Sequence, residues 1–310
     1  MHRIRLENVI QDKKLITKLY VFGHHSYEIV NRQPTPIWRI VQIDYLSPVT
    51  YNHLHMKEVG SATDKLRAVL VLAATAGTIA FNLLAATGYV NGVTPQAISE
   101  KYPTNITPAG YAFAIWSLIY LGMIAFSIYQ MLASNLVRFH GIRSPYIMSC
   151  ALNCAWIYFW HQEQVAICLA IILGLLAVLL LINVKIRTVD SIADSAIVKA
   201  PFGIYFGWVT AASLVNFAVL LAYEKVDLGS SASTVGVALI LFAAAMGVLV
   251  RIKLTNYFYP LAIAWALTAI AVKQSGQTWI VSAAAAGVVA CLIASLSFVM
   301  NLNSSINEQR

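Results

Sequence analysis

The sequence predicts an all-α protein, a polytopic membrane helix bundle of about eight transmembrane helices, each long enough to cross the hydrocarbon layer. Two observations support this fold class. First, 59% of the 310 residues are hydrophobic and 11% are charged, whereas about a quarter of the residues in a soluble domain are charged. Second, the apolar residues form continuous runs rather than alternating with polar ones, which favours helices over the strands of a membrane barrel. The lipid bilayer is therefore the first expected partner.

Eight apolar segments follow Arg67, and proline, glycine or charged residues separate each from the next. A spanning helix needs roughly 20 apolar residues, with about 17 to 25 tolerated. The third and seventh segments lie at the short end of this range. In chain order the segments cover residues 68–90, 109–132, 145–161, 165–184, 202–223, 233–250, 257–273 and 279–300. The breakers between them are Pro95, Pro103, Pro108, Pro145, Pro201, Gly229, Pro260 and Gly276.

Basic residues in the loops indicate how the helices are oriented. With the amino terminus in the cytoplasm, seven Lys and Arg residues fall in inside loops and three in outside loops, in agreement with the positive-inside rule. We therefore predict that both termini are cytoplasmic, in a membrane that the sequence does not identify. The net charge of +8 is spread over loops and the amino-terminal arm, so nucleic acid is not an expected partner. The inside set is Arg138, Arg143, Lys185, Arg187, Lys199, Arg251 and Lys253, and the outside set is Lys101, Lys225 and Lys273.

The first part of the chain differs in composition from the rest. Residues 1–64 contain several histidines and prolines, and no apolar run that could span a membrane or serve as a secretory signal. We predict no fold for this arm, and interpret it as disordered or as a gene-model extension upstream of a natural start at Met56. Residues 65–225 then form a five-helix membrane core, and residues 226–310 add three membrane helices and a short tail.

Three of the segments carry aromatic and amide residues at helical spacing. Residues three, four or seven positions apart share one face of a helix, so each of these segments presents a stripe. In the second segment the stripe follows a proline that suits the first turn of a helix. The stripes are Phe113, Trp116 and Tyr120 in segment two, Asn153, Trp156 and Trp160 in segment three, and Tyr205, Trp208, Ala212 and Asn216 in segment five.

These motifs resemble those of the tryptophan-rich sensory protein and translocator family, TspO/MBR. The second helix of that family has a Pro-Gly start and then a Trp and a Tyr four apart, as residues 108–120 do here. Its third helix has Leu-Asn-x-Ala-Trp, matched by residues 152–156. Its fifth has a Pro-Tyr-x-x-Trp-x-x-x-Ala-x-x-x-Asn-like pattern, matched by residues 201–216 with Tyr205 shifted relative to the proline. The resemblance covers residues 66–225.

The chain departs from that family in length and in one motif. The family normally has five helices, so the arm and helices six to eight are additional, and Thr-Pro-Ala-Gly-Tyr stands where a Pro-Pro-Gly-Trp type is usual. The resemblance implies a five-helix bundle around a pocket, covered by the loop after helix one. Its ligands would be porphyrins or haem, or sterols as in animal members, with no cofactor required. The candidate ligand-binding residues are Trp116, Tyr120, Asn153, Trp156, Tyr205, Trp208 and Asn216.

Several of these features have a purely structural interpretation as well. Asn82, Asn153 and Asn216 are either hydrogen-bonding contacts between helices or part of a ligand pocket. The aromatic residues either fill the bundle or stack on a flat ligand. The long outside loop, residues 90–108, is a lid or a plain connector. The Gly-x-x-x-Gly at Gly203 permits close helix contact, within the bundle or in a homodimer. His161 fits an exposed interfacial position better than a haem ligand.

The sequence contains no pattern that indicates an enzyme. It has no nucleotide-binding loop, no His-Glu-x-x-His and no nucleophile elbow. The four cysteines lie in apolar runs, which favours buried thiols over metal ligands or disulfides. We expect a receptor, sensor or carrier for a hydrophobic planar ligand. The alternative is a transporter or permease subunit for a small molecule, which would need charged or broken helices near the membrane midplane.

Overall fold

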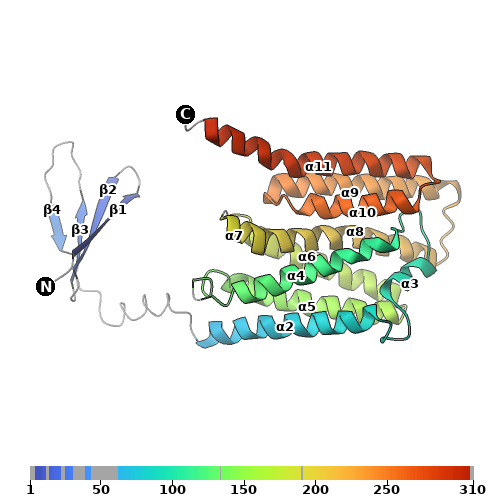
Figure 1. Cartoon of the computed structure of the whole chain (residues 1–310), viewed down its shortest axis with the longest axis horizontal. Coiled ribbons are helices and arrows are strands. Elements are labelled where there is room, and N and C mark those ends of the chain that lie inside the picture. Colours follow the sequence, from blue (N-terminus) through green and yellow to red (C-terminus); the bar gives the residue numbers. More distant parts are fainter. Residues whose placement is uncertain are drawn as a thin grey trace. The chain divides into compact units, whose positions relative to one another are not determined.

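The structure, a computed structural model, divides into two compact units, residues 1–61 and 62–310. It describes four strands within residues 4–42, and residues 62–132, 134–189 and 191–307. Figure 1 shows the strands and the helices of these two units. Side chains are described only in the second unit, and the functional argument rests on that unit alone.

The first unit contains an antiparallel sheet that we did not predict. Strands β1 (Ile4–Gln11), β2 (Lys14–Val21), β3 (His25–Val30) and β4 (Arg39–Gln42) pair in the order β1-β2-β3-β4. Residues 1–64 contain no long apolar run, which is why we predicted no fold for them. The signal that this prediction missed is the content of β-branched and aromatic residues in short stretches such as β2. Met56, the alternative start, lies outside the described residues.

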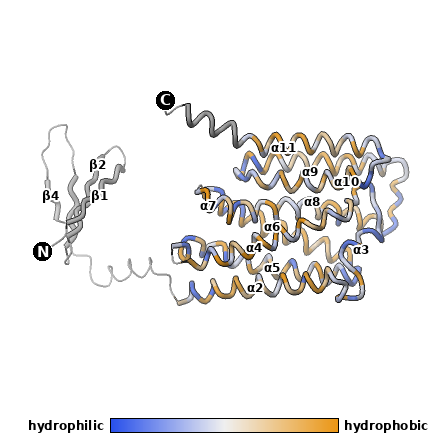
Figure 2. The backbone as a smooth tube through the Cα atoms, viewed as in Figure 1, coloured by the Kyte–Doolittle hydropathy of each residue, from blue (hydrophilic) through white to orange (hydrophobic). Residues whose placement is uncertain are grey.

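The second unit is helical, and each of the eight predicted apolar segments is a helix in the predicted order. The long helices lie side by side in Figure 1, and Figure 2 shows that hydrophobic residues predominate in their coloured parts. The polytopic helical bundle is therefore confirmed. Its elements are α2 (Ala62–Ala86), α3 (Pro95–Lys101), η1 (Gly110–Ala114), α4 (Ile115–Tyr129), α5 (His140–His161), α6 (Val165–Lys185), α7 (Ile192–Asp194), the π-helical turn η2 (Ser195–Lys199), α8 (Ala200–Tyr223), η3 (Gly229–Ser231), α9 (Ala232–Leu254), α10 (Tyr259–Lys273) and α11 (Thr278–Asn307).

In the described part of the chain, six helices are long and apolar enough to cross a membrane. They are α2, η1 with α4, α6, α7 through α8, η3 with α9, and α11. The third and seventh predicted spans, α5 and α10, are not among the six. Helix α10 has only 15 residues, and α5 has 22 residues but includes polar side chains such as Arg143 and Asn153.

Helix α8 is the centre of the unit. It packs against α4, α6, α9 and α10, and 61% of its most apolar window is buried, against at most 39% in the other candidate spans. Because α8 is covered on most sides, any polar side chain on it must find a partner within the protein or a ligand.

Two glycines of α8 allow a close approach by α10 and by Asn256 in the connection before it. A Cβ atom at Gly207 would lie 2.5 Å from the carbonyl oxygen of Tyr259 and 2.9 Å from the Cβ of Ala262, and one at Gly203 would overlap the amide of Asn256. The Gly-x-x-x-Gly motif therefore serves a contact within the chain, so it gives no support to a homodimer.

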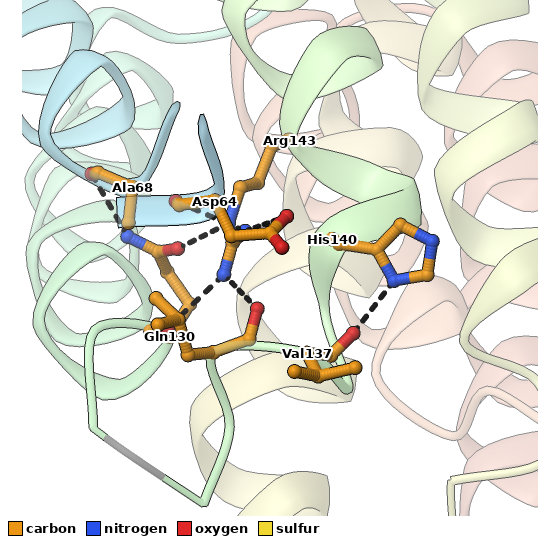
Figure 3. Close-up of polar contacts among 7 residues, drawn as sticks. Asp64, Ala68, Gln130, Val137, His140 and Arg143 are labelled. Carbon is orange, nitrogen blue, oxygen red and sulfur yellow. Dashed lines mark hydrogen bonds and ion pairs between the residues drawn. The ribbon is translucent and has the colours of Figure 1, made fainter. Parts of the chain in front are cut away.

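A buried arginine ties together the ends of α2, α4 and α5 (Figure 3). The Arg143 side chain is fully buried. Its Nε donates to Oε1 of Gln130 at 2.7 Å, and Nη2 donates to the carbonyl oxygen of Leu136. Its Nη1 lies 3.3 Å from the carbonyl oxygen and 3.4 Å from the carboxylate of Asp64. Gln130 in turn donates to the carbonyl oxygen of Ala68 at 3.0 Å. This network joins α2, α4 and α5 at the end of the bundle opposite α3 (Figure 1).

Candidate functional site

A cavity of about 50 Å³ lies among α4, α5, α6, α8 and α10, and residues of the segment between α2 and α4 cover it. Five aromatic rings line it together with two amides, and the rest of the wall is mainly aliphatic. The aromatic and amide residues are Phe113, Trp116, Asn153, Trp156, Trp160, Trp208 and Asn216. The three stripes predicted from the sequence therefore converge on one cavity.

Five of the seven candidate residues line this cavity, namely Trp116, Asn153, Trp156, Trp208 and Asn216. Tyr120 and Tyr205 do not. They pack against the ring of Trp116, with centroid distances of 5.6 Å and 5.8 Å. These tyrosines therefore support a wall residue, and neither is part of the wall.

The set of lining helices differs from the five-helix bundle around a pocket that the resemblance implies, by the absence of helix one and the presence of α10. Helix one, α2, is not among the lining elements, whereas α6 contributes Ile172 and Leu175 and α10 contributes Ala266 and Ile270. No sequence signal distinguishes these four residues, because they are ordinary apolar residues in apolar helices. The close approach of α10 to α8 explains how a helix beyond the five-helix core reaches the cavity.

Three indole rings of the wall take part in two stacked pairs, one of them with the supporting ring of Tyr120. Trp116 stacks on Tyr120 with planes 22° apart, and Trp156 stacks on Trp160 at 5.2 Å with planes 17° apart. Trp208 meets Trp116 edge-on at 6.4 Å. Stacked and edge-on packing both hold rings in fixed orientations, so the cavity has flat, rigid aromatic surfaces.

The amide of Asn153 is held from behind by α2. Its Oδ1 accepts a hydrogen bond from Nδ2 of Asn82 at 2.7 Å, and the same Nδ2 donates to the carbonyl oxygen of Thr78 at 2.9 Å. Asn82 and Asn153 thus form a contact between helices, one of the two interpretations left open by the sequence. Asn153 also lines the cavity, so for this residue both interpretations hold.

Several polar atoms of the cavity wall have no partner among the described residues. These atoms are Nδ2 of Asn153, Nε1 of Trp156, Nε1 of Trp208, and both amide atoms of Asn216. The four side chains are buried, with exposed fractions between 1% and 8%. An unpaired buried polar group costs about 1–3 kcal/mol, so a ligand or an ordered water at these atoms would offset that cost.

Residues 87–109 are called the lid segment below. Two parts of this segment, α3 and Pro108, cover the cavity. Thr94 caps α3 by accepting a hydrogen bond from the amide of Ala97 at 3.2 Å. Ser99 of α3 and Pro108 line the cavity. Figure 1 places α3 at the end of the bundle where α5 and α6 are joined. Residues of this loop therefore cover the cavity, a position that is compatible with the lid interpretation.

One side of the lid segment is attached to the α5–α6 turn. Nε1 of Trp160 donates to the carbonyl oxygen of Pro95 at 3.0 Å, and Nδ2 of Asn91 donates to that of His161 at 2.8 Å. Nζ of Lys101 forms an ion pair with Glu163 at 2.7 Å, and the Tyr102 hydroxyl donates to the same carboxylate. Hydrogen bonds from Lys101 and Tyr102 hold the pKa of Glu163 below its usual value. The carboxylate therefore stays ionised at neutral pH, and the contact weakens only as the pH falls through that lowered pKa.

The other side of the lid segment is attached to α10 and the residue that follows it. The amide of Ala109 donates to the carbonyl oxygen of Ala269 at 2.9 Å. Nε2 of Gln274 donates to the carbonyl oxygens of Thr104 at 3.0 Å and Thr107 at 3.2 Å. Helix α10 thus forms one wall of the cavity and also holds its cover.

His161 differs from its expected position. We predicted an exposed histidine at the membrane interface, but its side chain is 1% exposed and its Nδ1 lies 2.7 Å from the carbonyl oxygen of Ile157. It is not among the residues that line the cavity. All four cysteines are free thiols, and the described residues contain no group of three or more side chains that could hold a metal ion.

Comparison with known proteins places this architecture in a family. A family model described as TSPO-like protein matches residues 68–298. The match runs from α2 into α11, so it extends past the residues 66–225 that carry the motif resemblance and includes α9 and α10. No curated protein and no solved structure matches the chain. Since the family model covers most of the chain, including every helix that lines the cavity, the chain belongs to the TSPO-like protein family.

Proposed function

We propose that this integral membrane protein is a receptor, sensor or carrier that binds a hydrophobic, planar ligand in the cavity. The observation that supports the proposal most is the convergence of three aromatic stripes on one cavity, with buried polar atoms that lack partners. Porphyrin, haem or a related tetrapyrrole is the ligand class suggested by the motif resemblance, and a sterol is the second choice. Such ligands offer flat surfaces for stacking on indole rings.

A binding role is favoured over catalysis by the chemistry of the wall. Among the described residues that line the cavity there is no carboxylate, histidine, lysine, arginine or cysteine. General acid–base and nucleophilic catalysis depend on such groups. We therefore propose that the protein is not an enzyme and that it needs no cofactor.

The size of the cavity makes binding dependent on movement. About 50 Å³ of space is far less than the roughly 300–1,000 Å³ of usual small-molecule sites. The helices that form the walls are packed against each other, whereas the lid segment is attached at the α5–α6 turn by side chains that are partly exposed, Lys101 at 56% and Glu163 at 34%. We propose that the lid segment moves to admit the ligand.

Trp116→Ala tests the proposed site. The substitution removes an aromatic surface from the wall and the ring on which Tyr120 and Tyr205 pack, so we expect protoporphyrin binding to weaken by about 1–3 kcal/mol. Titration of the purified protein, followed by tryptophan quenching and porphyrin absorption, measures the change. The control is Trp279→Ala, because Trp279 is 77% exposed at the start of α11. Equal losses in both variants, or no binding by the unmodified protein, would remove this site.

The orientation in the membrane is a separate proposal, with both termini cytoplasmic. Gln162 follows α5, Thr188 follows α6, and both are exposed. The 21 residues of α6 give it a length of about 32 Å at 1.5 Å per residue, so these two positions should lie on opposite sides of the membrane. We expect a cysteine at position 162 to react with an impermeant maleimide in intact cells, and one at position 188 to react only after permeabilisation. The opposite pattern would reverse the orientation.

A further inference from the structure

One arginine of α9 is buried at the end of the bundle away from the lid segment. The lid segment is attached where α6 begins, whereas Thr255, directly after α9, donates to the carbonyl oxygen of Arg187, just after α6 ends, at 3.1 Å. Arg251 lies in the last turn of α9. It is only 8% exposed, and its Nε has no hydrogen-bond partner. A buried charge in a membrane protein is costly unless it is neutralised, so Arg251 needs a counter-ion.

The acidic residues described at this end already have basic partners. Asp64 pairs with Arg143, and Asp194 pairs with Arg138. Arg251 instead lies over the ring of Tyr257, with 3.7 Å between Cζ and the ring centroid. An aromatic ring attracts a cation but supplies no oxygen acceptor for the N–H groups at the edge of the guanidinium. Among the described residues, the charge of Arg251 is therefore not neutralised.

The guanidinium lies where α9 and α11 meet. One turn before Arg251, Gly247 faces α11 so closely that a Cβ there would lie 2.6 Å from the sulfur of Cys291. One turn after Cys291, Ser295 donates to the carbonyl oxygen of Tyr257 at 2.8 Å. The two helices and the residues that follow α9 thus form one junction around the guanidinium, called the α9–α11 junction below.

Apolar side chains surround this junction on the outside of the bundle. Leu249 and Ile252 of α9 are 48% and 63% exposed, and Leu292 and Leu296 of α11 are 40% and 63% exposed. In a bilayer such a surface contacts acyl chains. Arg251 lies three residues before α9 ends, about 4.5 Å along the helix axis. An anion at this depth is more readily supplied by a phospholipid than by free phosphate, because its acyl chains cover the exposed leucines.

We propose that Arg251 binds the headgroup phosphate of an anionic phospholipid at the α9–α11 junction, with the ring of Tyr257 holding the guanidinium in place. A zwitterionic headgroup carries its own cation and neutralises the arginine less well. The proposal goes beyond the function proposed for the cavity, because it assigns a lipid site at the other end of the bundle. With both termini in the cytoplasm, this site faces the leaflet that carries the anionic lipids.

Phosphatidylglycerol and phosphatidylcholine with the same oleoyl chains form the matched pair for the test. The full-length protein is stripped of lipid in a neutral detergent, and each lipid is titrated in. Native mass spectrometry counts the bound lipids, and the melting temperature is followed in parallel. We expect one phosphatidylglycerol to bind at least about tenfold more tightly than phosphatidylcholine, the lower range for hydrogen bonds to a charged group, and to raise the melting temperature more. Inorganic phosphate should not displace it.

Substitutions at two basic residues of α9 locate the site. Arg251→Gln removes the buried charge, so the preference for phosphatidylglycerol should fall to about twofold or less. Lys253→Gln is the matched control, because it removes an equal charge from an exposed side chain of the same helix end, and it should keep the preference. Arg251→Lys keeps the charge without the planar fork of donors and should keep only part of the preference. This variant provides the comparison if the glutamine variant does not fold.

Three results would overturn the proposal. Equal binding of the two lipids by the unmodified protein would exclude a site for anionic lipid. Equal losses in the position 251 and position 253 variants would show a general attraction by surface charge. Displacement of phosphatidylglycerol by inorganic phosphate would make free phosphate the occupant. Porphyrin binding enters none of these measurements, so the function proposed for the cavity is tested separately.

Discussion

Replacing Arg143 by leucine is expected to lower the free energy of unfolding of the helical unit by about 3–5 kcal/mol, the range for removing one partner of a buried charged network. The guanidinium is fully buried, donates hydrogen bonds to Gln130 and Leu136, and pairs with Asp64. Without it, the Gln130 amide and the Leu136 carbonyl group lose a partner in a place that water does not reach. The melting temperature of the purified protein in detergent measures the loss.

Two further variants sharpen that result. Arg143→Lys keeps the charge but not the planar fork of donors, so it should recover only part of the stability. Arg187→Leu is the matched control, because this side chain is exposed and should change the melting temperature little. If the Arg143→Leu and Arg187→Leu variants have the same melting temperature, the network of Figure 3 does not stabilise the helix ends.

Gly207→Val is expected to separate α10 from α8. The new Cβ would lie 2.5 Å from a backbone oxygen of Tyr259, and backbone cannot rotate out of the way as a side-chain end can. We expect a loss of about 3 kcal/mol in stability, at the upper end of overpacking effects. Because α10 carries Ala266 and Ile270 of the cavity wall, porphyrin binding should weaken as well.

The control for this prediction is Gly77→Val on α2. A Cβ at Gly77 would meet nothing within 4 Å, and valine is no worse than glycine in a helix. This variant should melt and bind like the unmodified protein. A Gly207→Val protein with unchanged melting and binding would show that α8 and α10 need no close contact.

The positions of the helices could be predicted because their signals are local. Apolar runs and the prolines and glycines between them set the ends of each helix without reference to the rest of the chain. The sheet of the first unit was missed for a related reason, since strands of four to eight residues give a much weaker local signal than a helix of twenty.

The cavity was only partly predictable. Trp116 and Asn153 stand out chemically, so the sequence could suggest them. Ile172 of α6 and Ala266 of α10 are wall residues only because of how the helices pack, which no spacing in the sequence reveals. Tyr205 shares the stripe of Trp208, yet its ring lies against Trp116. A helix face is broad enough to hold both wall residues and those that support them.

The short length of α10 has a consequence for where the lid segment lies in the bilayer. Fifteen residues extend about 22 Å, less than the roughly 30 Å of the hydrocarbon layer. The lid segment meets the end of this helix and bonds to Ala269, four residues before it ends. Irregular backbone beside so short a helix needs partners within the protein wherever it lies inside the lipid layer. Breaking its bonds to Gln274 and Ala269 would remove those partners, whereas the Lys101–Glu163 ion pair is partly exposed. If the lid segment moves as proposed, we therefore expect its α10 side to act as the hinge and its α5 side to open.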